Sequence, residues 1–185
     1  MINKKKAIFI VLAILLIVLF ILIYVNRTPK KTVSTTTSTV PLTQAKYLDK
    51  IIPGETTEQE VLQDFGRPVA SEGGALQYKS TSTNRNNEIL IQKGTVSFIK
   101  EIVSYKDTKK LSDLVNQYGE SGYLYGPDAV NGYFLYYHPE LGVAYLANPI
   151  TETVLEIWYF SPTTIENFKN LYAPDYSDKY PSNGF

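Results

Sequence analysis

An uninterrupted apolar run, Ala7–Val25, is the feature that most constrains how this chain folds. Its nineteen residues, at about 1.5 Å each in a helix, reach roughly the 30 Å thickness of the hydrocarbon core of a bilayer. The run contains no charged residue, glycine or proline, and basic residues flank it, namely Lys4, Lys5 and Lys6 before it and Arg27, Lys30 and Lys31 after it. We therefore expect residues 1–31 to be a transmembrane anchor with basic flanks.

A cleaved signal peptide is the alternative interpretation of this segment. Signal peptides have an apolar stretch of about 7–15 residues and a cleavage site of small residues, whereas this run is longer and continues into Tyr24, Val25 and Asn26. The chain has no cysteine that could carry a lipid anchor. Flanking charge and a Thr/Ser-rich stalk at 32–45 favour a single-pass protein with a cytoplasmic N-terminus and an extracytoplasmic C-terminal domain.

The charge is unevenly distributed along the chain. Residues 1–31 contain six basic and no acidic side chains, so the remaining residues carry 12 basic and 18 acidic side chains, a net charge of −6. A mildly acidic domain is not expected to have nucleic acid as its partner.

Residues 46–106 have the pattern of one helix followed by three strands. Thr56 and Thr57 are each followed three residues later by Gln59 or Glu60, so either threonine can begin a helix with a capping box. Gly66 then fits the C-terminal end of this helix. The strands are expected at 75–79, 88–93 and 95–105, with a hairpin turn at 93–94.

Residues 107–173 repeat this plan and add a last helix. Thr108 can cap a helix whose apolar residues have helical spacing, namely Leu111, Leu114, Val115 and Tyr118. Strands are expected at 133–137, 142–147 and 153–160, and a last helix at 164–172 that starts from Thr163 and Glu166. The two units align at a shift of 53 positions in the helices and 55 in the last strands.

The predicted fold class is therefore α+β. We expect an N-terminal transmembrane helix, then tandem helix-β-β-β units that form antiparallel sheet with the helices packed on one face. The opposite face would be open, and residues 174–185 would be a flexible tail.

One segment of the first unit resembles a known family. The stretch Pro53–Pro68 reads Pro-Gly-Glu-Thr-Thr-Glu-Gln-Glu-Val-Leu-Gln-Asp-Phe-Gly-Arg-Pro, and with the three strands expected after it, it resembles the SmpA/OmlA outer-membrane lipoprotein family. The tandem arrangement resembles the related β-lactamase-inhibitor-protein fold. The resemblance covers residues 52–103 and, more weakly, 108–160. It implies a module that works by protein–protein contact, in envelope assembly or enzyme inhibition, although this chain lacks the lipid-bearing cysteine of the family.

The inventory of reactive side chains predicts no catalytic residues. His138 is the only histidine, and it lies between a strand and Pro139, where a turn residue is the simpler interpretation than a general base. One histidine without cysteine cannot form a zinc site. A calcium site at 175–178 lacks a glycine-centred ligand loop, so we expect neither a metal nor a cofactor.

Clustered aromatic residues indicate a binding site more strongly than the reactive side chains indicate a catalytic one. Eleven of the 24 aromatic residues lie between Tyr118 and Phe160, and such side chains frequently anchor protein interfaces. Alternation places Glu156, Trp158 and Phe160 on one face of the last strand. If Glu156 faces water, Trp158 is an exposed anchor; the alternative is that Trp158 packs under a helix. The predicted binding residues on the sheet face are Tyr133, Tyr136, Trp158 and Phe160.

Together these patterns predict a membrane-anchored, extracytoplasmic module that binds a protein partner and catalyses no reaction. The alternatives are a purely structural component of the cell envelope and an enzyme of unknown class.

Overall fold

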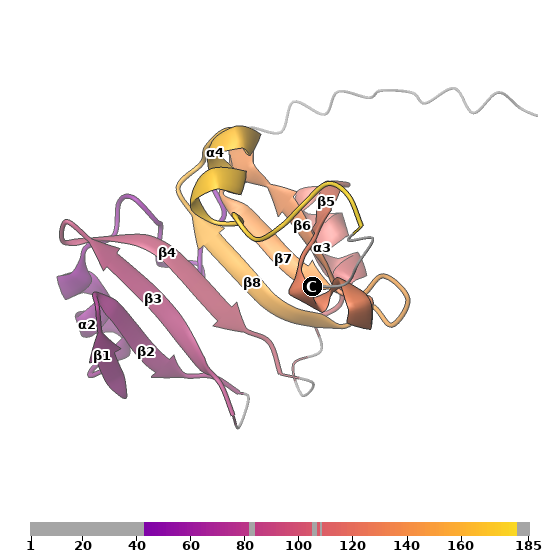
Figure 1. Cartoon of the computed structure of the whole chain (residues 1–185). Helices are drawn as coiled ribbons and strands as arrows, with labels where there is room; N and C mark the ends of the chain where they lie inside the picture. Colours follow the sequence, from indigo (N-terminus) through magenta and orange to yellow (C-terminus); the bar gives the residue numbers. More distant parts are fainter. Residues whose placement is uncertain (1–42, 82–83, 105–106, 108, 181–185) are drawn as a thin grey trace, which may run out of the picture. The chain divides into compact units, whose positions relative to one another are not determined.

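Eight antiparallel strands form one sheet in the order β1-β2-β3-β4-β8-β7-β6-β5 (Figure 1).

This computed structural model describes residues 43–81, 84–104, 107 and 109–180. The chain divides into the units Met1–Thr39 and Val40–Phe185, and all described residues belong to the second. In chain order the described elements are α2 (Glu58–Phe65), β1 (Ala70–Glu72), β2 (Ala75–Lys79), β3 (Asn86–Gln92), β4 (Thr95–Ile102), α3 (Leu111–Tyr118), β5 (Gly122–Tyr125), β6 (Phe134–His138), β7 (Val143–Ala147), β8 (Val154–Phe160) and α4 (Ile165–Leu171), with short 3₁₀ helices at Pro127–Asn131 and Pro139–Leu141.

The predicted tandem units of one helix and three strands are wrong, because four strands follow α2 and four follow α3. The strands that were not predicted, β1 and β5, have only three and four residues, and β1 is exposed along its whole length. Strands this short carry too little alternation to be recognised in a sequence. All eight strands join one sheet because β4 pairs with β8, from Phe98↔Phe160 to Ile102↔Glu156.

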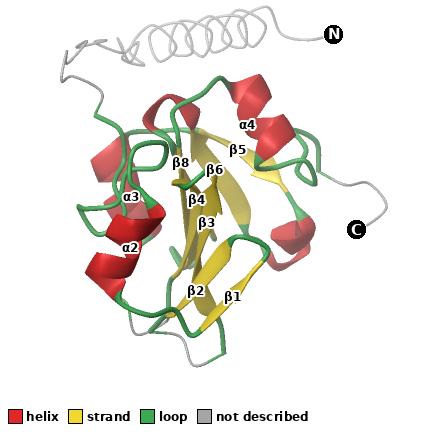
Figure 2. Cartoon of the chain, turned by 90° about the vertical axis from the view of Figure 1, so that its left-hand side faces the viewer, coloured by secondary structure: helices red, strands yellow, loops and turns green. Residues whose placement is uncertain are grey.

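The prediction that the helices share one face is also wrong. Figure 2 shows α2 and α3 on one side of the sheet and α4 on the other. The face under α4 requires a cover because its strands present large apolar side chains there, namely Leu124, Leu135, Leu146, Trp158 and Phe160. Phe168 of α4 is fully buried against this second core. We call the two sides the α2/α3 face and the α4 face.

The core on the α2/α3 face is the larger one. Val61 of α2 and Leu111 and Leu114 of α3 pack on buried residues of the central strands, namely Ile89, Ile99, Val143, Tyr145, Ile157 and Tyr159. The segment before α2 completes this layer, because the rings of Tyr47 and Phe65 stack at 5.9 Å between centroids.

The predicted start of α2 is confirmed, whereas the caps of α3 and α4 lie two residues and one residue after the predicted positions. Thr57 and Glu60 form the capping box of α2, in which the Thr57 N–H donates to Glu60 Oε2 at 2.7 Å. The N-cap of α3 is Lys110, whose N–H donates to Asp113 Oδ2; the predicted cap, Thr108, lies outside the described residues. The cap of α4 is Thr164, one residue after the predicted position.

The predicted membrane anchor requires a correction. In the part of the chain that the structure describes, no helix is both long enough and apolar enough to cross a membrane. The segment 7–25 and most of the predicted stalk lie outside the described residues. The described structure therefore does not support the predicted single-pass topology, the membrane as a partner or the localisation derived from them.

The described part of the predicted tail, residues 174–180, contacts the domain. Ser177 pairs with Tyr125, and each N–H donates to the carbonyl of the other at 2.8 Å. The Tyr176 ring packs edge-on against Trp158 at 5.8 Å, and Lys169 of α4 forms an ion pair with Asp178 at 2.7 Å.

Candidate functional site

Two of the four predicted binding residues, Trp158 and Phe160, lie in the core on the α4 face. Trp158 is 5% exposed, and its Nε1–H donates to Glu156 Oε2 at 2.8 Å. Glu156 is itself buried, so the condition under which Trp158 would be an exposed anchor is not met. The Phe160 ring stacks on the rings of Phe168 and Tyr172.

The other two predicted residues are half-buried and lie apart from each other. Tyr133, just before β6, packs against the core on the α4 face. Tyr136 of β6 packs against the core on the opposite side, where its ring stacks on Tyr145 at 5.6 Å. The structure therefore does not bring the four predicted residues into one surface.

Tyr136 instead belongs to a group of aromatic side chains on β5 and β6, which we call the aromatic patch: Tyr123, Tyr125, Phe134 and Tyr136. The Tyr123 ring lies 5.2 Å from Phe134, 5.5 Å from Tyr125 and 5.6 Å from Tyr136, measured between ring centroids. Tyr123 is 43% exposed and the other three are partly exposed. These four rings form one continuous surface on the α2/α3 face.

Strand register explains why this surface forms. In the antiparallel pair, Tyr123 lies opposite Tyr136 and Tyr125 lies opposite Phe134, so all four side chains point to the same face. Tyr123, Tyr125 and Phe134 belong to the aromatic cluster between Tyr118 and Phe160 but were not among the predicted binding residues. They were missed because β5 was not predicted, and only the pairing of β5 with β6 places Tyr123 and Tyr125 opposite Tyr136 and Phe134.

The chemistry of the patch is apolar with polar tips. The pKa of Tyr125 is raised, mainly by its hydrogen bond with Tyr123 and less by partial burial. The pKa of Tyr136 is also raised, mainly by burial. Since an unperturbed tyrosine has a pKa of about 10, both phenols are neutral at pH 7. The Tyr123 and Tyr125 hydroxyls lie 3.4 Å apart.

His138 ends β6 and is buried rather than presented to solvent. Its Nε2 lies 3.2 Å from the Tyr145 hydroxyl, and its Nδ1 lies 3.8 Å from Glu140 Oε1. Burial lowers the pKa of His138, against the smaller opposing effect of Glu140. The ring is therefore neutral near pH 7 and packs near Tyr118, at 6.1 Å between centroids.

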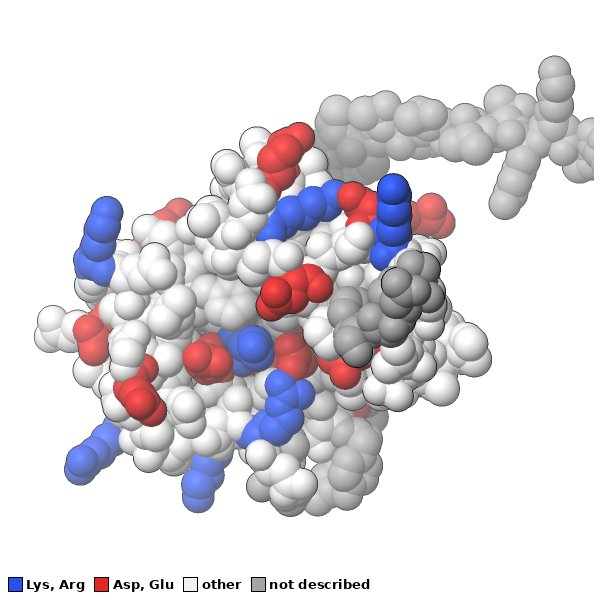
Figure 3. All heavy atoms as spheres, in the orientation of Figure 1, with Lys and Arg blue, Asp and Glu red and all other residues white. Residues whose placement is uncertain are grey.

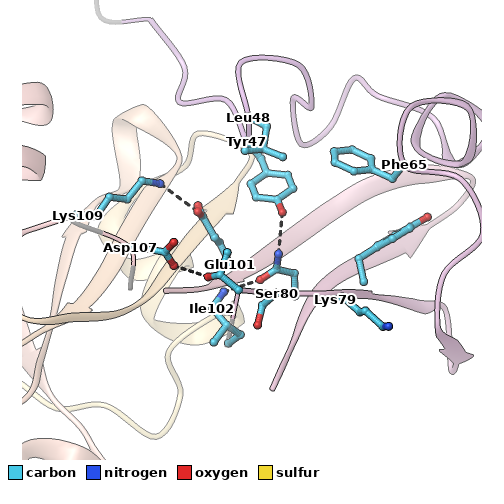
Figure 4. A pocket seen from close by; sticks show the side chains of 12 residues that line it. Tyr47, Leu48, Phe65, Lys79, Ser80, Glu101, Ile102, Asp107 and Lys109 are labelled. Atoms are coloured by element: carbon cyan, nitrogen blue, oxygen red, sulfur yellow. Dashed lines mark hydrogen bonds and ion pairs between the residues drawn. The ribbon is translucent and has the colours of Figure 1, made fainter. Parts of the chain in front are cut away.

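A separate cavity of about 690 Å³ lies beside the core on the α2/α3 face (Figure 4). Tyr47 and Phe65 lie on one side of it, and Glu101, Asp107 and Lys109 lie on the other. Glu101 Oε1 pairs with Lys109 Nζ at 3.0 Å, and Glu101 Oε2 accepts a hydrogen bond from the Tyr159 hydroxyl at 2.9 Å.

The carboxylate of Glu101 influences the tyrosines around it. Burial, with Glu101 as the next cause, raises the pKa of Tyr47 to about 12 and the pKa of Tyr118 to about 12. The pKa of Tyr159 is raised further, again by burial first and Glu101 second. These phenols remain protonated across the physiological range, and Glu101 is the common negative group that disfavours their ionisation.

Among the described residues, no group of three or more His, Cys, Asp or Glu side chains could hold a metal ion. In the segment 175–178, considered above for calcium, Asp178 is paired with Lys169.

Comparisons with known proteins assign the chain to no family. No protein-family model matches it, and no curated protein matches it. Among solved structures, it is similar to a DUF4309 family protein (YjgB) from Bacillus subtilis subsp. subtilis str. 168, with 13% identity, 60% of this chain and 82% of that chain covered, and a TM-score of 0.44. A likeness at this level supports no conclusion about function, and the resemblance to the SmpA/OmlA family stays a prediction.

Proposed function

We propose that this chain is a protein-binding module and that the aromatic patch contacts the partner. The observation that carries the proposal is the continuous contact of four aromatic rings on two adjacent strands, with Tyr123 substantially exposed. Tyrosine supplies a large, rigid contact area with a hydroxyl at its tip, which is why it is enriched in protein interfaces.

The position of the patch at the edge of the sheet supports the same function. β5 is the last strand of the sheet, and the only described residue that pairs with its outer edge is Ser177, opposite Tyr125. Because outward-pointing backbone groups alternate along a strand, the N–H and C=O of Tyr123 also point away from β6. A partner that contacts the patch can therefore also bond the backbone at Tyr123.

The composition of the patch favours an uncharged contact. Figure 3 shows the opposite face, the α4 face, where acidic and basic side chains are interspersed and neither sign forms a large patch. The patch itself consists of three tyrosines and one phenylalanine. Association is therefore expected to depend on aromatic contact rather than on long-range charge attraction, and to be only weakly sensitive to salt.

The test combines site-specific photocrosslinking with partner recovery. A photoreactive phenylalanine analogue at position 123 is expected to crosslink one partner, whereas the same group at Ile150, an exposed residue of the β7–β8 loop, is not. Tyr123→Ala combined with Phe134→Ala is expected to reduce recovery of that partner about tenfold, equivalent to about 1.4 kcal/mol. Ile150→Ala is the matched control and is expected to leave recovery unchanged.

Circular dichroism verifies that each variant is folded. A folded double variant that recovers the partner as well as the parent chain would overturn the proposal. Failure to recover any stoichiometric partner with the parent chain would favour the purely structural alternative.

A further inference from the structure

The cavity beside the core on the α2/α3 face combines an aromatic wall with a largely buried carboxylate. The Phe65 ring stacks on Tyr47 and lies 5.6 Å from Tyr78, so three rings form one wall. The core links the wall to the carboxylate, because the Tyr47 ring lies 5.6 Å from the buried Tyr159, whose hydroxyl donates to Glu101.

Glu101 retains capacity to bind a further cation. Its side chain is 15% exposed, and each of its two oxygens has one described partner. A carboxylate offers about four acceptor positions, so one remains on each oxygen. Asp107, by contrast, accepts from Thr81 and from the Ser104 N–H and serves to hold its own loop.

An ammonium group already lies next to Glu101, and it belongs to the protein. The Lys109 side chain is 43% exposed, so it can swing into water without burying its charge. An ammonium ligand could then replace Lys109 Nζ beside Glu101 while its alkyl groups lie against the aromatic side chains that line the cavity.

We propose that this cavity binds a small organic ammonium ion, with Glu101 as the counter-charge and Tyr47, Phe65 and Tyr78 as the aromatic wall. A volume of about 690 Å³ lies within the range of about 300–1,000 Å³ typical of small-molecule sites. The carboxylate of Glu101 favours a ligand that donates hydrogen bonds or carries positive charge. This site is separate from the aromatic patch, so either assignment can fail while the other holds.

The experiment is a calorimetric titration of the full chain with choline and with its uncharged analogue 3,3-dimethyl-1-butanol. Choline is expected to bind at least about tenfold more tightly than the analogue, because only choline gains the charge attraction of Glu101. Equal affinity for the two compounds would overturn the proposal. The same titration is made with vesicles of phosphatidylcholine, which carry the choline group in a lipid. Binding to these vesicles without binding to free choline would overturn the assignment to a small ion.

Three variants locate the binding in the cavity. Glu101→Gln is expected to weaken choline about tenfold, and Lys109→Met is expected to strengthen it about threefold by removing the competing ammonium. Glu88→Gln removes a carboxylate from β3, on the α4 face, and is the matched control with unchanged affinity. If Glu101→Gln fails to fold, Lys109→Met still decides, because unchanged or weakened binding in that variant would overturn the proposal.

Discussion

The guanidinium of Arg85 is ion-paired with the carboxylate of Glu156, although the two residues are 71 positions apart in the chain. Arg85 precedes β3, whereas Glu156 lies on β8, so the pair connects the first four strands to the last four across the α4 face. The Glu156 side chain is 8% exposed and also accepts the hydrogen bond of Trp158, whose ring lies 5.7 Å from the ammonium of Lys100.

The first prediction concerns the asymmetry of this pair. Arg85→Met is expected to destabilise the fold by about 2–3 kcal/mol, because it leaves a buried carboxylate without its counter-charge. Glu156→Gln is expected to lower the free energy of unfolding by only about 1 kcal/mol, because the amide oxygen still accepts from Trp158 and Arg85 is half-exposed to water. Urea denaturation of both variants measures the difference.

The double variant is the control for this first prediction. If the two side chains act as a pair, the combined loss is smaller than the sum of the single losses. Additive losses would show that Arg85 and Glu156 contribute independently.

The second prediction tests the cover of the α4 face. Phe168→Ala is expected to reduce the free energy of unfolding by about 3–5 kcal/mol, because the ring is fully buried and stacks on Phe160 at 5.1 Å. Leu171→Ala, on the same helix but 69% exposed, is expected to change it by less than about 0.5 kcal/mol. Similar losses for the two variants in thermal or urea unfolding would contradict the packing of α4 on the sheet.

Local signals in the sequence predicted the elements whose chemistry is confined to neighbouring residues. The capping box of Thr57 and Glu60 is confirmed, and so is the hairpin turn, where Lys93 and Gly94 both have positive φ. β2 begins and ends where alternation predicted, at Ala75 and Lys79. These features depend on hydrogen bonds or side-chain spacing within a few residues, which is the range over which sequence pattern is informative.

The features that were missed depend on contacts distant in sequence. Alternation correctly placed Trp158 and Phe160 on one face, but whether that face is exposed depends on the docking of α4 and the segment after it. The aromatic patch likewise depends on the pairing of Tyr123 with Tyr136, which no single strand's pattern reveals. Edge strands as short as β1 and β5 are defined by their partners rather than by their own composition.

The third prediction concerns acid stability. Burial lowers the pKa of His138, so the unfolded chain, with a histidine pKa of about 6.5, takes up the proton more readily than the folded one. The contribution of neutral His138 to stability is therefore fully present above about pH 6.5 and is lost as the pH falls toward the folded-state pKa. The free energy of unfolding falls by up to about 1.4 kcal/mol per pH unit in this range. The measurement is the free energy of unfolding by urea at pH 7.5, 6.5 and 5.5.

Because His138 is the only histidine, one variant isolates its effect. His138→Gln keeps a side chain that can bond the Tyr145 hydroxyl and removes the titration. It is expected to flatten the dependence between pH 7.5 and 5.5. The same slope in the variant would assign the effect to carboxylates instead.

The fourth prediction separates backbone strain from steric overlap at two glycines that both have positive φ. At Gly142, with φ of 68°, an added Cβ would overlap the carbonyl oxygen of Phe160, and the Gly142 carbonyl accepts the Phe160 N–H at 2.9 Å. At Gly119, with φ of 92°, an added Cβ would meet no atom within 4 Å. Gly119→Ala is expected to destabilise by about 1–3 kcal/mol through backbone strain alone, because its φ of 92° and ψ of 179° lie in a region that is essentially restricted to glycine.

Gly142→Ala is expected to destabilise by at least about 3 kcal/mol, because the chain at the end of β8 must also move away from the turn before β7. Thermal unfolding of the two variants gives the comparison. Equal losses would mean that Phe160 and its neighbours shift aside at little cost, and the turn before β7 would then not determine the position at which β8 ends.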